Sequence, residues 1–146
     1  MIQCIVCGQP MEKNSACDCC GYRDGQANAP HQLPVGTLLK GQYRIGRVLG
    51  QGGFGITYLG WDTYLNVPVA IKEYYPSGLV MRENSRSLEV SCCEDASGTR
   101  FEKNRERFLR EAQILAKLGD VPQVVHVRGF FPENGTAYIV MESSDT

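Results

Sequence analysis

The stretch from Tyr43 to Lys72 constrains the fold of this chain more than any other. Two segments with alternating apolar residues flank a loop that carries four glycines, and a third segment, V-P-V-A-I-K, ends on Lys72. This alternation predicts strands, because successive side chains of a strand point to opposite faces of a sheet. The spacing Gly50-x-Gly52-x-x-Gly55 is weakly specific by itself, and a dinucleotide-binding fold would require a helix after it. A strand follows here instead, which predicts a glycine-rich hairpin loop at the end of a sheet.

The remaining patterns predict one main helix and two more strands. Residues 102–119 carry an apolar stripe at helical spacing and end on a glycine, which commonly follows a helix. Residues 124–131 and 136–141 have the pattern of strands joined by a turn at 132–135. Together with strands at about 43–49, up to about 61 and at 67–74, they predict an α+β fold with a five-stranded antiparallel sheet. Residues 76–100 have little periodicity and predict an insertion, with a short strand at 88–90.

Two charged residues stand out within these elements. Lys72 shares a sheet face with the small residue Ala70, which leaves space for a flat ligand against the sheet. Glu111 lies three residues after Phe108, on the buried stripe of the predicted helix. A carboxylate at such a position needs a cationic partner, because burying an unpaired charge is costly. Arg107, four residues earlier in the helix, is one candidate partner, and Lys72 is the other.

The first 25 residues carry four cysteines in two C-x2-C pairs, each pair followed by glycine. Two such turns facing each other can form a tetrahedral zinc site, and the predicted ligands are Cys4, Cys7, Cys17 and Cys20. Few large apolar side chains are present, so this segment could hardly fold without its structural Zn²⁺. Cys19 competes with Cys20 for the fourth position, although the glycine that follows favours Cys20. The segment resembles the small zinc ribbons attached to many bacterial signalling proteins; the alternative is a disordered tail.

Composition narrows the partner and the location. The formal net charge is −1, and residues 1–25 contain two basic residues against three acidic ones, so we expect no nucleic-acid partner. No apolar run approaches the roughly 18 residues of a membrane span, and no signal-peptide pattern opens the chain. Seven cysteines without such a signal indicate reduced thiols and a cytoplasmic protein. The predicted domain order is a ribbon at 1–25, a linker at 26–36 and a lobe at 37–146.

The glycine loop, the lysine of V-A-I-K and the helix carboxylate together resemble the N-terminal lobe of bacterial, eukaryotic-type Ser/Thr protein kinases over about residues 37–142. The resemblance implies that Lys72 holds the phosphates of ATP, bound with Mg²⁺, and that Glu111 pairs with Lys72. Thr57 stands where the family usually has valine, and serines stand where it usually has an apolar hinge. The implied nucleotide-contacting residues are Leu49, Gly50, Gly52, Gly53, Phe54, Gly55, Thr57, Ala70, Lys72, Met141, Glu142 and Ser144.

The 146 residues contain neither the H-R-D-x-x-x-x-N nor the D-F-G motif. In this family those motifs orient the substrate hydroxyl and hold Mg²⁺. The sequence therefore predicts the ATP-binding half of a kinase, cut at the hinge and inactive by itself. Apolar positions would then be covered by a C-terminal lobe, another protein or a second copy. A non-catalytic regulatory or protein-interaction module is the alternative, and a zinc-ribbon nucleic-acid binder is disfavoured by the charge.

Overall fold

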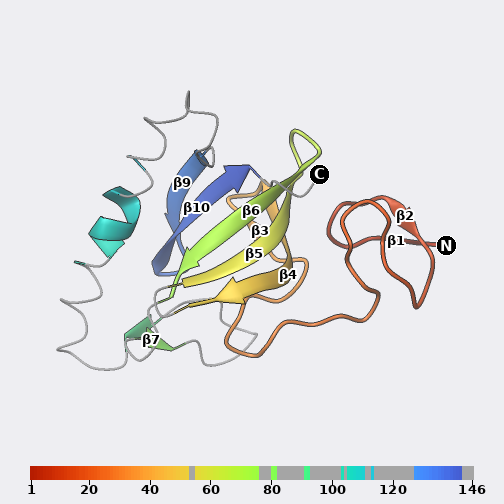
Figure 1. Cartoon of the computed structure of the whole chain (residues 1–146), viewed down its shortest axis with the longest axis horizontal. Coiled ribbons are helices and arrows are strands. Elements are labelled where there is room, and N and C mark those ends of the chain that lie inside the picture. The colour runs from red at the N-terminus through yellow and green to blue at the C-terminus, as the bar shows by residue number, and fades with distance from the viewer. Residues whose placement is uncertain are drawn as a thin grey trace.

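The largest unit of the protein is an antiparallel sheet with the strand order β3-β4-β5-β6-β10-β9. Its strands are β3 (Leu38–Leu39), β4 (Tyr43–Gln51), β5 (Gly55–Asp62), β6 (Val67–Tyr74), β9 (Val127–Glu133) and β10 (Thr136–Glu142). The computed structural model describes residues 1–52, 55–75, 80–81, 91–92, 103, 105–110, 113 and 127–142. Figure 1 shows the N-terminal segment beside the end of this sheet, next to β4 and β5.

The sheet has six strands where the sequence predicted five. The additional strand is β3, whose two leucines pair with Arg44 and Tyr43 of β4. Two residues are too short to show a period-2 pattern, so β3 is not among the strands that the sequence predicted. The antiparallel character of the sheet and the positions of its five longer strands agree with the prediction.

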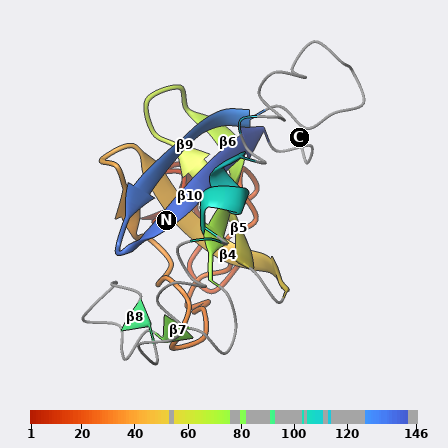
Figure 2. The same ribbon diagram turned by 90° about the vertical axis from the view of Figure 1, so that its left-hand side faces the viewer.

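Two small sheets and one helical segment complete the described elements. β1 (Ile2–Gln3) pairs with β2 (Pro10–Met11), and β7 (Val80–Met81) pairs with β8 (Ser91–Cys92) inside the predicted insertion. The short strand predicted at 88–90 lies outside the described residues. Residues 105–110 are helical, within the predicted range 102–119, and Figure 2 shows this segment in front of the sheet. No helix in the described part of the chain is long and apolar enough to cross a membrane.

Local residue chemistry explains two of the hairpins that join the longer strands. Between β5 and β6, the Asp62 carboxylate accepts the backbone N–H groups of Tyr64 and Leu65 at 2.9 and 3.2 Å. Between β9 and β10, Asn134 and Gly135 have φ values of 54° and 73°. Two consecutive left-handed residues form the tight turn whose twist matches antiparallel strands, and Asn-Gly is the dipeptide most suited to it.

β6 places alternate side chains on the two faces of the sheet, as its sequence predicts. Val69 and Ile71 are fully buried on one face, while Ala70 and Lys72 are half-buried on the other. Tyr74 continues the Lys72 face and lies 5.3 Å, between ring centroids, from Phe108 of the helical segment. The helix therefore covers the end of the face to which Lys72 belongs.

Glu73 is a fully buried carboxylate on the opposite face. Its Oε1 accepts the hydroxyl of Tyr58 at 2.9 Å, and its Oε2 accepts the hydroxyl of Tyr138 at 2.6 Å. The Tyr58 oxygen in turn accepts the backbone N–H of Leu33 at 3.0 Å. Hydrogen bonds to a carboxylate are among the stronger ones in proteins, so this network ties three strands and the preceding segment together.

The stretch predicted as a linker packs onto the lobe at several points. Leu33 is fully buried, and the side-chain amide of Asn28 donates to the carbonyls of Leu33 and Gly46 at 2.8 and 3.0 Å. His31 is half-buried, and its Nε2 lies 2.9 Å from Gln51 Oε1. Composition alone suggested a linker because proline, asparagine and alanine dominate it, yet a single leucine anchors it.

Replacing Tyr138 with phenylalanine should destabilise the fold, because the buried Glu73 loses a charge-assisted hydrogen bond. We expect a loss of about 1–3 kcal/mol in the free energy of unfolding measured in urea. Tyr64→Phe is the matched control, since Tyr64 is 70% exposed and should unfold as the unchanged protein does. Equal effects of the two substitutions would show that the buried network contributes nothing particular to stability.

Candidate functional site

Lys72 belongs to a row of residues that crosses the sheet. Thr57 lies opposite Lys72 across β5 and β6, and Ile139 lies opposite it across β6 and β10. The next row on the same face contains Leu59, Ala70 and Met141 in register. The predicted nucleotide-contacting residues Thr57, Ala70, Lys72 and Met141 therefore share one face in two adjacent rows.

The Lys72 side chain is half-buried, and its Nζ lies 5.9 Å from the centroid of the Phe108 ring. At this distance the ring face attracts the ammonium group and limits the directions in which it can point. Glu111, the predicted partner of Lys72, lies outside the described residues, so the Lys72–Glu111 pair stays a prediction. Arg107, the alternative partner for that carboxylate, is exposed on the helical segment.

The glycine-rich loop between β4 and β5 is open on one side and crowded on the other. Gly52 donates its N–H to the Gly55 carbonyl at 2.9 Å across the loop. A Cβ atom at Gly55 would lie 2.7 Å from the Glu73 carbonyl oxygen and 3.5 Å from Lys72 Cε, so only glycine fits there. A Cβ at Gly50 or Gly52 would meet nothing within 4 Å. Backbone groups there can approach a ligand closely, and Gly53 and Phe54 lie outside the described residues.

The remaining predicted nucleotide contacts lie near the ends of the strands. Leu49 on β4 is 41% exposed, as an apolar side chain at the edge of a ligand site can be. Glu142 follows Met141 and therefore points to the other face, where its Oε1 lies 3.6 Å from Arg128 Nη2. This side-chain direction is compatible with the nucleotide contact predicted for Glu142 when that contact is made through the backbone. Ser144 lies outside the described residues.

The four cysteines predicted as metal ligands converge on one point. The Sγ atoms of Cys4, Cys7, Cys17 and Cys20 all lie within 4.8 Å of one another. Cys4 and Cys20 are separated by 3.4 Å, and Cys7 and Cys17 by 3.6 Å. Four thiolates at the usual 2.3 Å from a tetrahedral ion are about 3.8 Å apart, so the donor set fits such an ion. Cys19 is exposed and does not belong to the group, so Cys20 is the fourth member.

Equivalent turns shape the two halves of this cluster. Gly8 donates its N–H to the Cys4 carbonyl and Gly21 donates to the Cys17 carbonyl, both at 2.9 Å. Both glycines have φ of 81°, a left-handed value that favours glycine. The backbone N–H of Val6 also points at Cys4 Sγ at 3.4 Å, a donor that stabilises a thiolate. The two C-x2-C-G sequences therefore fold into a matched pair of ligand-presenting turns.

The thiols of the cluster differ in how readily they ionise without a metal. Burial raises the pKa of Cys7 well above its ordinary value, and burial together with the neighbouring Cys4 raises the pKa of Cys20 to about 12. Burial also opposes ionisation of Cys17, but the backbone N–H groups of Cys20 and Cys19 hold its pKa below the ordinary value. A metal ion would therefore displace protons from Cys7 and Cys20 as it binds.

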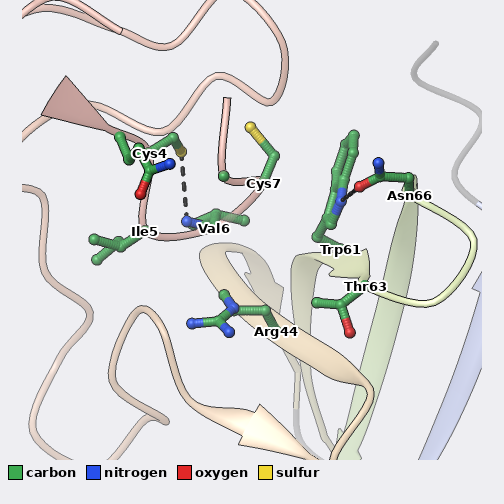
Figure 3. Close-up of a pocket in the computed structure, with 10 residues that line it drawn as sticks. Cys4, Ile5, Val6, Cys7, Arg44, Trp61, Thr63 and Asn66 are labelled. Atoms are coloured by element: carbon green, nitrogen blue, oxygen red, sulfur yellow. Dashed lines mark hydrogen bonds between the residues drawn. The ribbon is translucent and has the colours of Figure 1, made fainter. Parts of the chain in front are cut away.

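Sequence reasoning missed two lobe residues that adjoin the cysteine cluster. Trp61, the last apolar residue of β5, is 5% exposed and packs in one cluster with Cys4, Cys7 and Cys17. Arg44 lies opposite Trp61 across β4 and β5, and both line a cavity with the first cysteine turn, as Figure 3 shows. A lone tryptophan at the end of a strand was the available signal, but nothing in the sequence indicates what covers it.

Comparisons with known proteins support the resemblance of the lobe to Ser/Thr protein kinases. The chain is 38% identical over 106 residues to Serine/threonine-protein kinase C of Synechocystis, covering 72% of this chain and 17% of that protein. It is 35% identical over 117 residues to Serine/threonine-protein kinase PknJ of Mycobacterium tuberculosis, covering 79% of this chain and 16% of that protein. The chain thus spans less than a fifth of these relatives' length. No family model matches it.

A solved structure, PpkA-294 in its apo form, is 34% identical and superposes with a TM-score of 0.72, covering 77% of this chain and 39% of that one. The PknI kinase domain of Mycobacterium tuberculosis superposes with a TM-score of 0.52 at 24% identity, which supports the fold alone. With the strand order and the Lys72 face described above, these likenesses show that the chain belongs to the eukaryotic-type Ser/Thr protein kinases of bacteria and corresponds to their N-terminal lobe.

The cluster geometry predicts which cysteines are required for metal binding. Replacing Cys20 with serine should reduce bound metal in purified protein from about one equivalent to near zero, because a tetrahedral site loses a ligand. Replacing Cys19 with serine should leave the metal content unchanged, since Cys19 lies outside the cluster. Elemental analysis measures both. Retention of a full equivalent by the Cys20 variant, or its loss by the Cys19 variant, would contradict the assignment.

Metal affinity should fall as the pH falls, because protons compete for the thiols that the ion must ionise. We expect the affinity for added Zn²⁺ to weaken by at least about tenfold per pH unit below neutrality, one factor of ten for each proton displaced. Competition with a chromophoric chelator between pH 6 and pH 8 measures this slope. An affinity independent of pH would mean that the ligands are not these protonated thiols.

Proposed function

We propose that this lobe is the ATP-binding half of a Ser/Thr protein kinase, which transfers phosphoryl groups from ATP to protein hydroxyls in the complete enzyme. The observation that carries the proposal is the shared face of Thr57, Ala70, Lys72 and Met141, adjoining a glycine loop open at Gly50 and Gly52. A nucleoside triphosphate requires a cation, small and apolar side chains and a loop backbone that the phosphates can approach closely.

Each residue would contribute binding or positioning. Lys72 supplies a point charge for the α- and β-phosphates, and Phe108 limits where its ammonium group can point. Phosphate oxygens can approach the loop backbone closely at Gly50 and Gly52, because these residues have no side chain and the space beside them is open. Ala70 and Met141 present a flat apolar surface to the base. Mg²⁺, when bound with ATP, neutralises charge on the phosphates.

The four-cysteine cluster is proposed as a structural zinc site. Four thiolates in tetrahedral arrangement with no open position suit Zn²⁺ and exclude a catalytic role for the ion. Cys4, Cys7, Cys17 and Cys20 would hold it, and the equivalent turns at Gly8 and Gly21 orient the ligands. The ion would supply folding free energy to a segment that buries few large side chains.

Mg-ATP binding should depend on Lys72. Isothermal titration of the chain with Mg-ATP should show binding, and Lys72→Ala should weaken it at least about tenfold, because a charge-assisted phosphate contact is lost. Lys40→Ala is the matched control: Lys40 is exposed, and its Nζ lies over Phe131 away from Lys72. Unchanged binding in the Lys72 variant would exclude the nucleotide role.

The same material separates an enzyme from a non-catalytic module. These residues lack the family's catalytic and metal-binding motifs, so we expect no protein labelling from radioactive ATP even where titration detects binding. Lys72-dependent labelling would show that the catalytic groups lie elsewhere in these 146 residues. If titration detects no ATP at all, a regulatory or protein-contact module becomes the better description of the lobe.

A further inference from the structure

A cavity of about 390 Å³ lies between the four-cysteine segment and strands β4 and β5. One wall is the first cysteine turn, from Gln3 to Gly8, and the other is formed by lobe residues. The lobe residues that line it are Arg44, Trp61, Thr63 and Asn66. Figure 3 shows Arg44 beneath Ile5 and Val6, and the Trp61 ring standing between Cys7 and Asn66. The four-cysteine cluster therefore borders side chains of the kinase lobe.

Arg44 is the only charged side chain among the cavity-lining residues. It is half-buried, and within the described part of the chain its guanidinium has no hydrogen-bond or ion-pair partner. A divalent ion held by four thiolates carries a net charge of about −2. Arg44 lines the same cavity as Cys4 and Cys7, and opposite charges attract each other more strongly at a partly buried site than in water, so a metal-loaded cluster would attract Arg44.

Close packing supports the same contact. Trp61 is almost completely buried although it ends its strand, and the cysteine segment is what covers it. An added Cβ at Gly46 of β4 would lie 3.5 Å from Val6 Cγ1 and 2.7 Å from the Leu59 carbonyl oxygen. Glycine at this position therefore lets the first cysteine turn rest directly on the backbone of β4.

The contact lies on the face that carries the nucleotide residues. Trp61 pairs with Pro68, Leu59 with Ala70 and Thr57 with Lys72, and pairs two residues apart share a face. The Arg44–Trp61 row is thus two rows from the Lys72 row, about 13 Å along the strand. The glycine-rich loop joins β4 and β5 at the end opposite the cysteine segment. A change in the order of these two strands beside the segment can therefore extend to the loop.

We propose that the four-cysteine segment is a metal-dependent docking module, held on β4 and β5 by Arg44 and Trp61, through which metal occupancy controls the order of the strand pair that carries the glycine-rich loop. The proposal rests on the proposed metal site. If docking of the segment on the lobe strengthens metal binding by a given factor, bound metal must strengthen docking by the same factor, because linked equilibria are reciprocal. When the ion leaves, protons return to the buried thiols, so the cluster loses the negative charge that attracts Arg44 and the segment is released.

The first experiment measures Zn²⁺ affinity by chelator competition in the full chain. Arg44→Gln should weaken Zn²⁺ binding by about tenfold, because it removes the counter-charge from the lobe. Arg47→Gln is the matched control, since Arg47 lies on the same strand, is also half-buried and does not line the cavity. Equal affinities in the two variants would overturn the role of Arg44.

The second experiment follows amide hydrogen exchange with Zn²⁺ bound and after its removal. Exchange in β4 and β5 should accelerate at least about tenfold, while β9 and β10 stay protected, because the contacts described between the segment and the sheet lie on β4 and β5. The emission of Trp61, the single tryptophan, should shift to longer wavelength as it becomes solvated. Unchanged exchange in β4 and β5 with Zn²⁺ demonstrably bound overturns the docking proposal alone. Failure to bind Zn²⁺ at all overturns the metal site and the docking proposal together.

Discussion

The antiparallel pairing of β5 with β6 is the constraint on which the rest of the structure depends. It runs without a bulge from Gly55 opposite Tyr74 to Asp62 opposite Val67. Because side chains alternate along both strands, this register fixes which residues meet on each face. It places Thr57 beside Lys72 on one face and Tyr58 beside Ile71 on the other. A shift by one residue would bury Lys72 and expose the core.

Close approach between strands also explains two glycines of β5. At Gly55 the β6 backbone is too close for a side chain, and at Gly60 an added Cβ would lie 2.9 Å from the Arg44 carbonyl oxygen of β4. Glycine at these two positions therefore lets neighbouring strands pack closely, while the space beside Gly50 and Gly52 leaves the loop accessible. The Lys72 face and the contact with the cysteine segment are two parts of one twisted ribbon, so the same strand pairing constrains both.

Much of the lobe could be predicted because its signals are local. Alternating residues gave the five longer strands, Asn134–Gly135 gave a hairpin, and period 2 placed Lys72 with Ala70. The spacing of the cysteines predicted a cluster that does converge, with Cys20 inside it and Cys19 outside it; the role of the four as metal ligands stays a prediction. The roles of Glu111, Gly53, Phe54 and Ser144 stay predictions, because those residues lie outside the described part of the chain.

What could not be predicted depends on contacts between distant parts of the sequence. The pattern of β6 already places Glu73 on the buried face, but its partners Tyr58 and Tyr138 come from other strands. β3 is too short to have a period, and the segment that borders Arg44 and Trp61 lies about 40 and about 55 residues earlier in the chain, respectively. Composition describes residues 26–36 as a linker and cannot show that Leu33 is buried.

The burial of Leu33 has a consequence for what counts as one cooperative unit. Its backbone N–H donates to Tyr58, whose hydroxyl donates to Glu73, which adjoins Lys72 in the chain. A shortened chain that began at Thr37 would leave the Tyr58 oxygen without this donor and would open a hole where Leu33 packs. The lobe therefore extends, in energetic terms, into sequence that kinase motifs do not cover. A boundary drawn from motifs alone would cut through its core.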